Sequence, residues 1–120
     1  MARLADDTVA LARLRAICLG FPQAEEGVLQ NRPLFRVGNR RFAIFNGSDS
    51  PPRKRWLAAG RSVHFLADPE ERDALRQDPR FAPSPHHGDR GWFATRLDDG
   101  SVRWEELAEL LESAYRQVAP

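Results

Sequence analysis

LFRVGNRRFAIF, residues 34–45, consists of two runs of strand-forming residues joined by Gly38 and Asn39. Glycine and asparagine accept the positive φ angles that a two-residue hairpin turn requires. We therefore predict a β-hairpin with strands at 34–37 and 40–45. This hairpin makes an antiparallel sheet the starting point of the fold.

Further strands are predicted on both sides of the hairpin. Residues 28–30 form a weak strand before it. Residues 62–66 form a better one after it, because apolar residues alternate there with residues for the opposite face. Residues 55–58 are a candidate short strand, and residues 91–97 form the last strand. Residues 80–90 between them contain prolines and are predicted as a loop.

Helical patterns flank the strands. Apolar residues recur at three- and four-residue spacing over 104–118, with glutamates on the other side, which predicts an amphipathic C-terminal helix. A shorter apolar stripe over 11–18 predicts an N-terminal helix that begins at Asp7 or Thr8. A third, short helix over 68–78 is predicted between the last two strands, because an aspartate precedes it and a proline ends it.

These elements predict an α+β fold. We expect a two-layer sandwich, in which one antiparallel sheet packs against N- and C-terminal helices on one of its faces. A single domain covers residues 1–120. The apolar side of the last helix should pack on the apolar side of the sheet. The side chains expected in this contact are Trp104, Leu107, Leu111, Tyr115, Phe35, Phe42, Ile44 and Val63.

The composition is that of a globular domain. Apolar residues make up 42% and charged residues 29% of the chain, which permits a real core. No apolar run approaches the roughly 20 residues that cross a bilayer, and the first residues have no apolar stretch of the signal-peptide type. Cys18 is the only cysteine, so no internal disulfide is expected. These features predict a cytoplasmic protein without a membrane partner.

The sequence contains no pattern that identifies an enzyme. A zinc site needs three or four converging ligands, and His64, His86 and His87 are the only histidines. The spacing of a nucleotide-binding phosphate loop is absent. Cys18 lies on the apolar stripe of the first helix, where it is expected to be a core residue. We therefore expect no catalytic residue, no metal and no cofactor.

Basic residues gather at the hairpin and in the segment after it. Only Lys54 among the 18 basic residues is a lysine, and the formal net charge is +1. Basic side chains on hairpin tips and loops can bind phosphates, and an adjacent aromatic ring can stack on a base. The structural alternative is positive charge that protects the sheet edge from aggregation. The predicted DNA contacts are Arg40, Arg41, Arg53, Lys54, Arg55 and Trp56.

The segment 83–92 is a second candidate site. Its prolines stiffen the backbone, and its glycines permit a tight turn or the close approach of a partner. The residues expected to hold a ligand there, an anionic one, are His86, His87, Arg90 and Trp92. In the structural alternative, Trp92 closes one end of the core and Arg90 pairs with Asp89 or Asp78.

Four stretches of the chain form a pattern when they are taken together. They are RPLFRVGNRRFA at 32–43, DPRFAPSP at 78–85, GDRGWFATRL at 88–97 and WEELAELLESAYRQVAP at 104–120. These stretches are similar to the RPxFRVGGKxFA, DPxRFxxPP, GxRGWVxVRL and WDELxELLxxAYRLVAP stretches of the MmcQ/YjbR family. The resemblance covers nearly the whole chain, in order and with similar spacing.

The resemblance implies a fold akin to the frataxin-type sandwich and a DNA-binding role. We expect a non-enzymatic protein, and a monomer is assumed. The alternative is a domain that binds a protein or a small ligand and has no nucleic-acid role. Arg103 departs from the family pattern, which often has an aspartate there. An arginine cannot accept the amide hydrogens at the start of the last helix, so another group must cap it.

Overall fold

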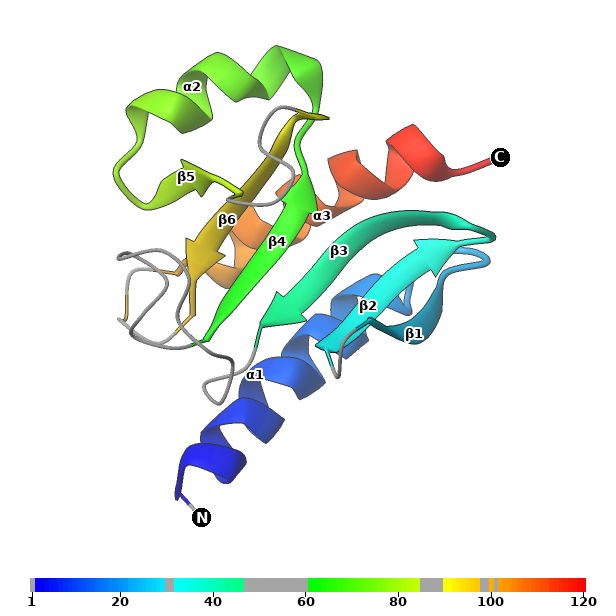
Figure 1. The fold of residues 1–120 in the computed structure, drawn as a ribbon, viewed down its shortest axis with the longest axis vertical. Coiled ribbons are helices and arrows are strands. Elements are labelled where there is room, and N and C mark those ends of the chain that lie inside the picture. Colours follow the sequence, from blue (N-terminus) through cyan, green and yellow to red (C-terminus); the bar gives the residue numbers. More distant parts are fainter. Residues whose placement is uncertain (1, 30–31, 47–60, 85–89, 98–99, 101) are drawn as a thin grey trace.

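The structure is built around one antiparallel sheet and two long terminal helices (Figure 1). The computed structural model describes residues 2–29 (side chains from residue 9), 32–46, 61–84, 90–97, 100 and 102–120. The helices are α1 (Ala2–Cys18), α2 (Arg72–Gln77), which follows a 3₁₀ turn at Pro69–Glu71, and α3 (Trp104–Val118). The strands are β1 (Glu25–Leu29), β2 (Arg32–Val37), β3 (Arg40–Asn46), β4 (Ser62–Leu66), β5 (Phe81–Pro83) and β6 (Trp92–Arg96).

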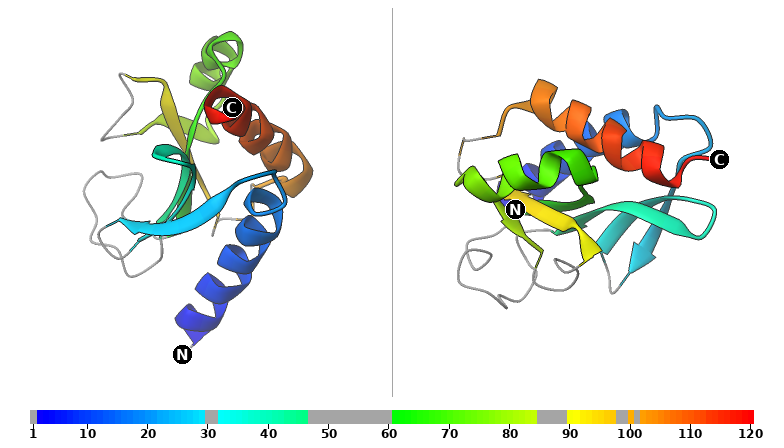
Figure 2. Two further views of the ribbon diagram at one scale, coloured as in Figure 1. Left: turned by 90° about the vertical axis from the view of Figure 1, so that its right-hand side faces the viewer. Right: turned by 90° about the horizontal axis from the view of Figure 1, so that it is seen from above.

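The strands follow the order β1-β2-β3-β4-β6-β5 across the sheet, and each neighbouring pair is antiparallel. Helices α1 and α3 lie on one face of the sheet, as Figure 2 shows from two sides, and α2 contacts the edge strand β5. We call the opposite side, on which no described helix packs, the open face. Its side chains include Leu34, Ile44, His64, Leu66 and Trp92. This arrangement confirms the predicted α+β fold with both terminal helices on one face.

The predicted hairpin is present as β2 and β3, joined by Gly38 and Asn39. Gly38 has a φ of 58°, the left-handed conformation that such a turn requires. The strands predicted at 62–66 and 91–97 are confirmed as β4 and β6. The candidate strand at 55–58 lies outside the described residues.

Two elements differ from the prediction. Helix α1 begins at Ala2, so Asp7 and Thr8, which were expected to cap it, lie inside the helix. Strand β5 lies in a segment predicted as a loop. Three residues are too few to show strand alternation, and Pro83 argues against a strand in general. The proline is tolerated because β5 is an edge strand, which has no neighbour on its outer side.

The main core fills the space between the sheet and the two terminal helices. Its largest side chains with less than 2% exposure are Phe35, Phe42, Phe65, Phe93, Leu14 and Leu111. Most residues of the predicted contact between α3 and the sheet lie in this core or pack against it. They are Leu107, Leu111, Trp104, Tyr115, Phe35, Phe42 and Val63. The predicted packing of the last helix is therefore confirmed for all of its members except Ile44.

Ile44 was predicted to face the helices, and this prediction is wrong. It lies in a second, smaller cluster on the open face. The register between β2 and β3 shifts between Phe35 and Arg36, so that Phe42 is an extra residue in β3. Phe42 and Ala43 both face the helices as a result, and Ile44 turns to the other side. The prediction assumed strict alternation, which this β-bulge interrupts.

The helix ends follow the expected chemistry. Arg103, the residue before α3, makes no side-chain hydrogen bond to the first helical turn. Asp68 does cap the 3₁₀ turn, because its carboxylate accepts a hydrogen bond from the N–H of Glu70 at 2.9 Å. None of the helices within the described ranges combines the length and the apolar character that a membrane crossing requires.

Candidate anion-binding site

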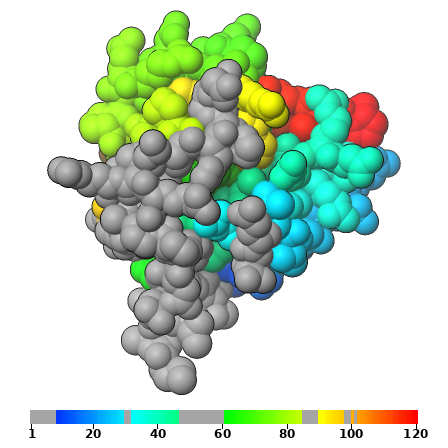
Figure 3. Space-filling view, viewed as in Figure 1, coloured from blue at the N-terminus to red at the C-terminus, as the bar shows by residue number. Residues whose placement is uncertain are grey.

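A hollow of about 280 Å³ opens at one end of the sheet. The β2–β3 turn, the end of β4, the start of β6 and the end of α3 all contribute to it. Figure 3 shows the hairpin, the start of β6 and the end of α3 gathered on one side of the molecule. The residues that line the hollow are Asn39, Arg40, Arg41, Ile44, Leu66, Arg90, Trp92 and Val118. We call this site the arginine hollow.

Strand β3 supplies two arginines and one apolar residue to the arginine hollow. Arg40 and Arg41 are its first residues, directly after the turn, and both side chains are exposed. Arg41 and Ile44 are three residues apart, so in a regular strand they would face opposite sides of the sheet. The extra residue Phe42 brings both of them to the hollow. The bulge therefore places a guanidinium group and an apolar side chain at the same site.

The turn at Gly91 positions Arg90 and Trp92. Gly91 has a φ of 90°, a backbone conformation that favours glycine. Its carbonyl accepts a hydrogen bond from the N–H of Ala67 at 2.9 Å. The guanidinium of Arg72 donates to the carbonyl of Ala67 at 3.1 and 3.2 Å, and a Cβ at Gly91 would clash with this guanidinium. Arg72 thus packs against this turn and fixes it to the end of β4.

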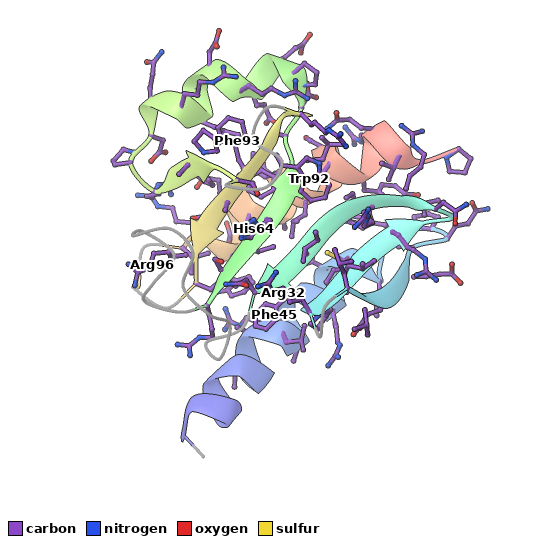
Figure 4. The ribbon with its side chains drawn as sticks, viewed as in Figure 1. Arg32, Phe45, His64, Trp92, Phe93 and Arg96 are labelled. Carbon is purple, nitrogen blue, oxygen red and sulfur yellow. The ribbon has the colours of Figure 1, made fainter. Side chains whose placement is uncertain are left out.

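The apolar part of the arginine hollow is rigidly supported. Trp92 pairs with Leu66 across β4 and β6, and Trp92 is only 9% exposed. The side-chain amide of Gln117 donates to the carbonyl of Leu66 at 2.9 Å, which holds the end of α3 beside Val118 and the hollow. Figure 4 shows Trp92 at this end of the sheet and His64 nearer its middle. Strands β4 and β6 and the end of helix α3 therefore form the apolar part of the hollow.

The arginines of the hollow differ from several arginines elsewhere in their electrostatic surroundings. Within the described part of the chain, no carboxylate pairs with Arg40, Arg41 or Arg90. On the helix-covered side and its edge, arginines form ion pairs at 2.6–2.9 Å. These pairs are Arg15–Glu26, Arg76–Asp73, Arg80–Asp78, Arg80–Glu106 and Arg116–Glu112. Arg40, Arg41 and Arg90 therefore leave positive charge at the hollow that no described carboxylate neutralises, and such charge attracts anions.

The structure joins residues from the two sites that the sequence predicted separately. Arg40 and Arg41 belong to the predicted DNA contacts, Arg90 and Trp92 belong to the predicted ligand segment, and all four line the hollow. The other predicted site residues lie outside the described residues; they are Arg53, Lys54, Arg55, Trp56, His86 and His87. Asn46, the last described residue before several of them, lies at the opposite end of β3 from Arg40.

The structural alternative for segment 83–92 is met only in part. Trp92 is buried, as that alternative requires, but it packs with Leu34 and Ile44 on the open face and not in the main core. Asp78 is bound by Arg80 at 2.7 Å and not by Arg90. Asp89, the other carboxylate of that alternative, lies outside the described residues. Hydrogen bonds from the Arg80 side chain hold the pKa of Asp78 below its usual value.

Sequence reasoning missed several residues of the hollow. Ile44 was assigned to the main core because the bulge cannot be read from alternation. Leu66 ends a predicted strand, but the sequence does not show that this strand pairs with the one that begins at Trp92. Gly91, between two residues of the predicted ligand segment, was a signal of a special turn that could have been used.

A buried polar cluster lies in the middle of the open face. Nδ1 of His64 is 3.0 Å from Oγ of Ser84, and Nε2 of His64 is 3.5 Å from Oγ of Ser62. The exposed fractions of these residues are 8%, 4% and 0% respectively. A serine nucleophile must be reached by its substrate, so this geometry fits a hydrogen-bonded part of the interior better than a catalytic pair.

Cys18 is also buried, as predicted. Burial, with a smaller contribution from the charge of Glu26, raises the pKa of its thiol to about 12, so the reactive thiolate is absent near neutral pH. No group of three or more histidine, cysteine, aspartate or glutamate side chains among residues with described positions is arranged to hold a metal ion.

Comparisons with known proteins place the chain in a family. The crystal structure of a protein from Pseudomonas syringae, a structural-genomics target, is similar with a TM-score of 0.67 over 89% of this chain and 97% of that chain. Sequence identity is 15%, so this likeness shows the fold alone. No curated protein matches the chain. A sequence model of the YjbR family matches residues 19–117. The match runs from the residue directly after α1 almost to the end of α3, and this chain therefore belongs to the YjbR family.

Proposed function

We propose that this protein binds DNA through the arginine hollow and the basic residues around it. The observation that carries the proposal is the meeting of Arg40, Arg41 and Arg90 at one site without a carboxylate partner among the described residues. Guanidinium groups match phosphate oxygens in two-point contacts. Arginines that have no competing carboxylate can make such contacts without first breaking an ion pair.

A fourth arginine extends the basic surface along the open face. Arg36 pairs with Arg41 across β2 and β3, so the two side chains are neighbours. Its own ion pair with Glu25 is loose, at 4.0 Å. The predicted contacts Arg53, Lys54, Arg55 and Trp56 remain part of this proposal on sequence grounds. Because phosphate contacts carry no base information, we expect binding that tolerates many DNA sequences.

The proposal includes a binding role without catalysis, in the cytoplasm and without a cofactor. The burial of Cys18 and of the His64–Ser84 pair supports it, since these are the described groups that most resemble a nucleophile. It also includes a fold of the frataxin type. Two terminal helices on the same face of an antiparallel sheet support this relationship.

A second candidate function is binding of a small anionic ligand without any nucleic acid. The observation that favours it is the concave shape of the site, in which Ile44 and Leu66 form an apolar floor. Ligand pockets commonly combine such a floor with a few polar groups.

The experiment that tests DNA binding compares two triple variants with the parent protein. The first replaces the arginines of the hollow: Arg40→Gln, Arg41→Gln and Arg90→Gln. The matched control replaces three arginines outside it: Arg15→Gln, Arg76→Gln and Arg116→Gln. Both variants lose the same charge. Affinity for a fluorescent oligonucleotide of mixed sequence is measured by anisotropy at several salt concentrations.

We expect the parent protein and the control to bind with a strong dependence on salt. Each phosphate contact contributes about −0.9 to the slope of log K against log salt for duplex DNA, so the hollow variant should lose about 3 units of slope. Equal binding by the hollow variant and the control would locate the interface elsewhere. Absence of binding by the parent at low salt would reject DNA binding and favour the small-ligand function.

A further inference from the structure

The arginine hollow has an apolar floor that phosphate binding alone does not explain. Ile44, Leu66, Trp92 and Val118 line it below the three arginines. A protein that touches only the DNA backbone needs basic groups on its surface, and it gains nothing from an apolar recess between them. The recess therefore points to a ligand that is charged at one end and apolar at the other.

The size of the hollow narrows the class of ligand. Its volume of about 280 Å³ lies just below the roughly 300–1,000 Å³ that small-molecule sites occupy. A single nucleotide, with one phosphate group and one flat base, is of this order and has this division of character. Longer polymers can enter the recess only one unit at a time.

A double helix presents the wrong groups to such a recess. Its bases are stacked and paired inside, and reaching one requires that it be flipped out at a cost in unpairing and unstacking. A single strand can turn one base into the hollow without that cost, while its phosphates remain at the surface. The combination of the three arginines with the apolar floor therefore favours an unpaired nucleotide.

One opposing term is present at the hollow. Helix α3 ends there, and the carbonyl end of a helix is equivalent to about half a negative charge. Three full positive charges outweigh it. In addition, the N–H of Ala119 donates to the carbonyl of Tyr115 at 2.9 Å, which satisfies part of that helix end. Among the described groups at the hollow, positive charge therefore predominates.

We infer that the arginine hollow receives one unpaired nucleotide, with its phosphate on Arg40, Arg41 and Arg90 and its base on the apolar floor. The protein then prefers single-stranded to duplex DNA. This inference rests on the proposed function in that DNA is the partner of this site, and it adds the form of DNA that is recognised. It uses only residues that the structure describes.

The test uses three probes of equal length on the full chain. They are a single-stranded oligonucleotide, the duplex made from it, and a fully abasic sugar-phosphate oligomer, which carries the same charge as the single strand but has no bases. Affinities are measured at one salt concentration. We expect the single strand to bind roughly five- to a hundredfold more tightly than the abasic oligomer, the range that stacking of one base supplies, and more tightly than the duplex.

Two variants separate the contribution of the apolar floor to binding from that of the three arginines. Leu66→Ala, which is only partly buried in the parent, should weaken binding of the single strand and leave binding of the abasic oligomer unchanged. Leu66→Met keeps an apolar side chain and serves as the matched control. The Arg40→Gln, Arg41→Gln, Arg90→Gln variant should weaken both probes. Circular dichroism melts check that each variant is folded.

The outcomes separate the inference from the function on which it rests. Equal affinity for all three probes, or tighter binding of the duplex, would overturn the inference and leave DNA binding in place. The same holds if Leu66→Ala weakens both single-stranded probes equally. Failure of every probe to bind would reject the proposed function itself.

Discussion

The two faces of the sheet differ in their packing and in the kinds of side chain that they bury. On the helix-covered face, fully buried phenylalanines from β2, β3, β4 and β6 pack against leucines of α1 and α3. On the open face, the apolar cluster is small, and buried polar residues such as His64 and Ser62 lie beside it. The first face therefore contributes most of the buried apolar core, whereas the second combines a small apolar cluster with buried polar side chains.

Charge follows the same division. On the helix side, Arg15 and Arg116 are bound to glutamates, and Arg80 binds two carboxylates at once. Such pairs on a surface contribute little to stability, but they neutralise their arginines. At the hollow, Arg40 and Arg41 are exposed without such partners among the described residues. A nearly neutral chain can therefore carry a cationic site, because the acids that the structure describes are placed elsewhere.

The largest expected effect tests whether the stability of the fold resides on the helix-covered face. Leu111 of α3 is 0% exposed in the main core. Leu111→Ala should lower the free energy of unfolding by about 2–5 kcal/mol, because it removes buried methyl groups and leaves a cavity. Chemical denaturation monitored by circular dichroism measures the change.

The matched substitution on the other face is Ile44→Ala. Ile44 is 9% exposed and belongs to the small cluster, so its truncation should cost less than that of Leu111. The comparison between the faces breaks down if Ile44→Ala is as destabilising as Leu111→Ala or more so.

The second effect concerns the turn that positions Arg90 and Trp92. Gly91→Ala places a side chain at a φ of 90° and brings a Cβ against the guanidinium of Arg72. We expect a loss of about 1–3 kcal/mol from the strained backbone, together with weaker binding of DNA. Thermal melts and anisotropy measure the two consequences.

A double-mutant cycle with Arg72→Ala sharpens this prediction. Removing the guanidinium relieves the contact but leaves the φ strain, so Gly91→Ala should cost less in the Arg72→Ala background than in the parent. Equal costs in both backgrounds would show that the guanidinium moves aside freely and that only the backbone matters.

The smallest expected effect concerns the side-chain carboxyl of Glu71. Burial, reinforced by the charges of Asp68, Glu109 and Glu70, raises the pKa of Glu71. Its Oε1 is buried and, among the described atoms, has no hydrogen-bond partner. A carboxyl whose pKa is raised on folding destabilises the folded state once the pH exceeds its unfolded value of roughly 4.3. Glu71→Gln should therefore stabilise the protein at pH 7, by about 0.5 kcal/mol or less.

The pH dependence provides the check on Glu71. The advantage of Glu71→Gln should shrink as the pH falls below the unfolded pKa of the glutamate, because the parent carboxyl is then protonated in both states. Melts at pH 7 and near pH 4 measure it. A stabilisation of equal size at both pH values would mean that charge is not its cause.

Most of the fold could be predicted from the sequence because its clearest elements are determined by residues that are close together in the chain. The hairpin is specified by Gly38 and Asn39, and α3 by the spacing of its apolar residues. Strand β5 was not readable, since its three residues become a strand only through pairing with β6. The start of α1 was misplaced because Asp7 and Thr8 have the chemistry of a cap without being one.

The candidate site was readable only in pieces. The sequence marked Arg40 and Arg41 at a hairpin tip and Arg90 and Trp92 in a proline-rich segment, but local patterns could not show that these pairs meet. Their meeting depends on the crossover that places β4 next to both β3 and β6. Long-range strand order is a property of the whole chain, and no short window of sequence contains it.

The bulge at Phe42 also decides how this chain can be aligned with its relatives. A relative that lacks one residue between the positions of Arg41 and Ile44 would have a regular strand there. Its counterparts of Arg41 and Ile44 would then be two residues apart, and they would still lie on the same side of the sheet. A single gap at this strand is therefore compatible with a hollow of this kind, whereas a relative with the same number of residues and no bulge would place the two side chains on opposite faces.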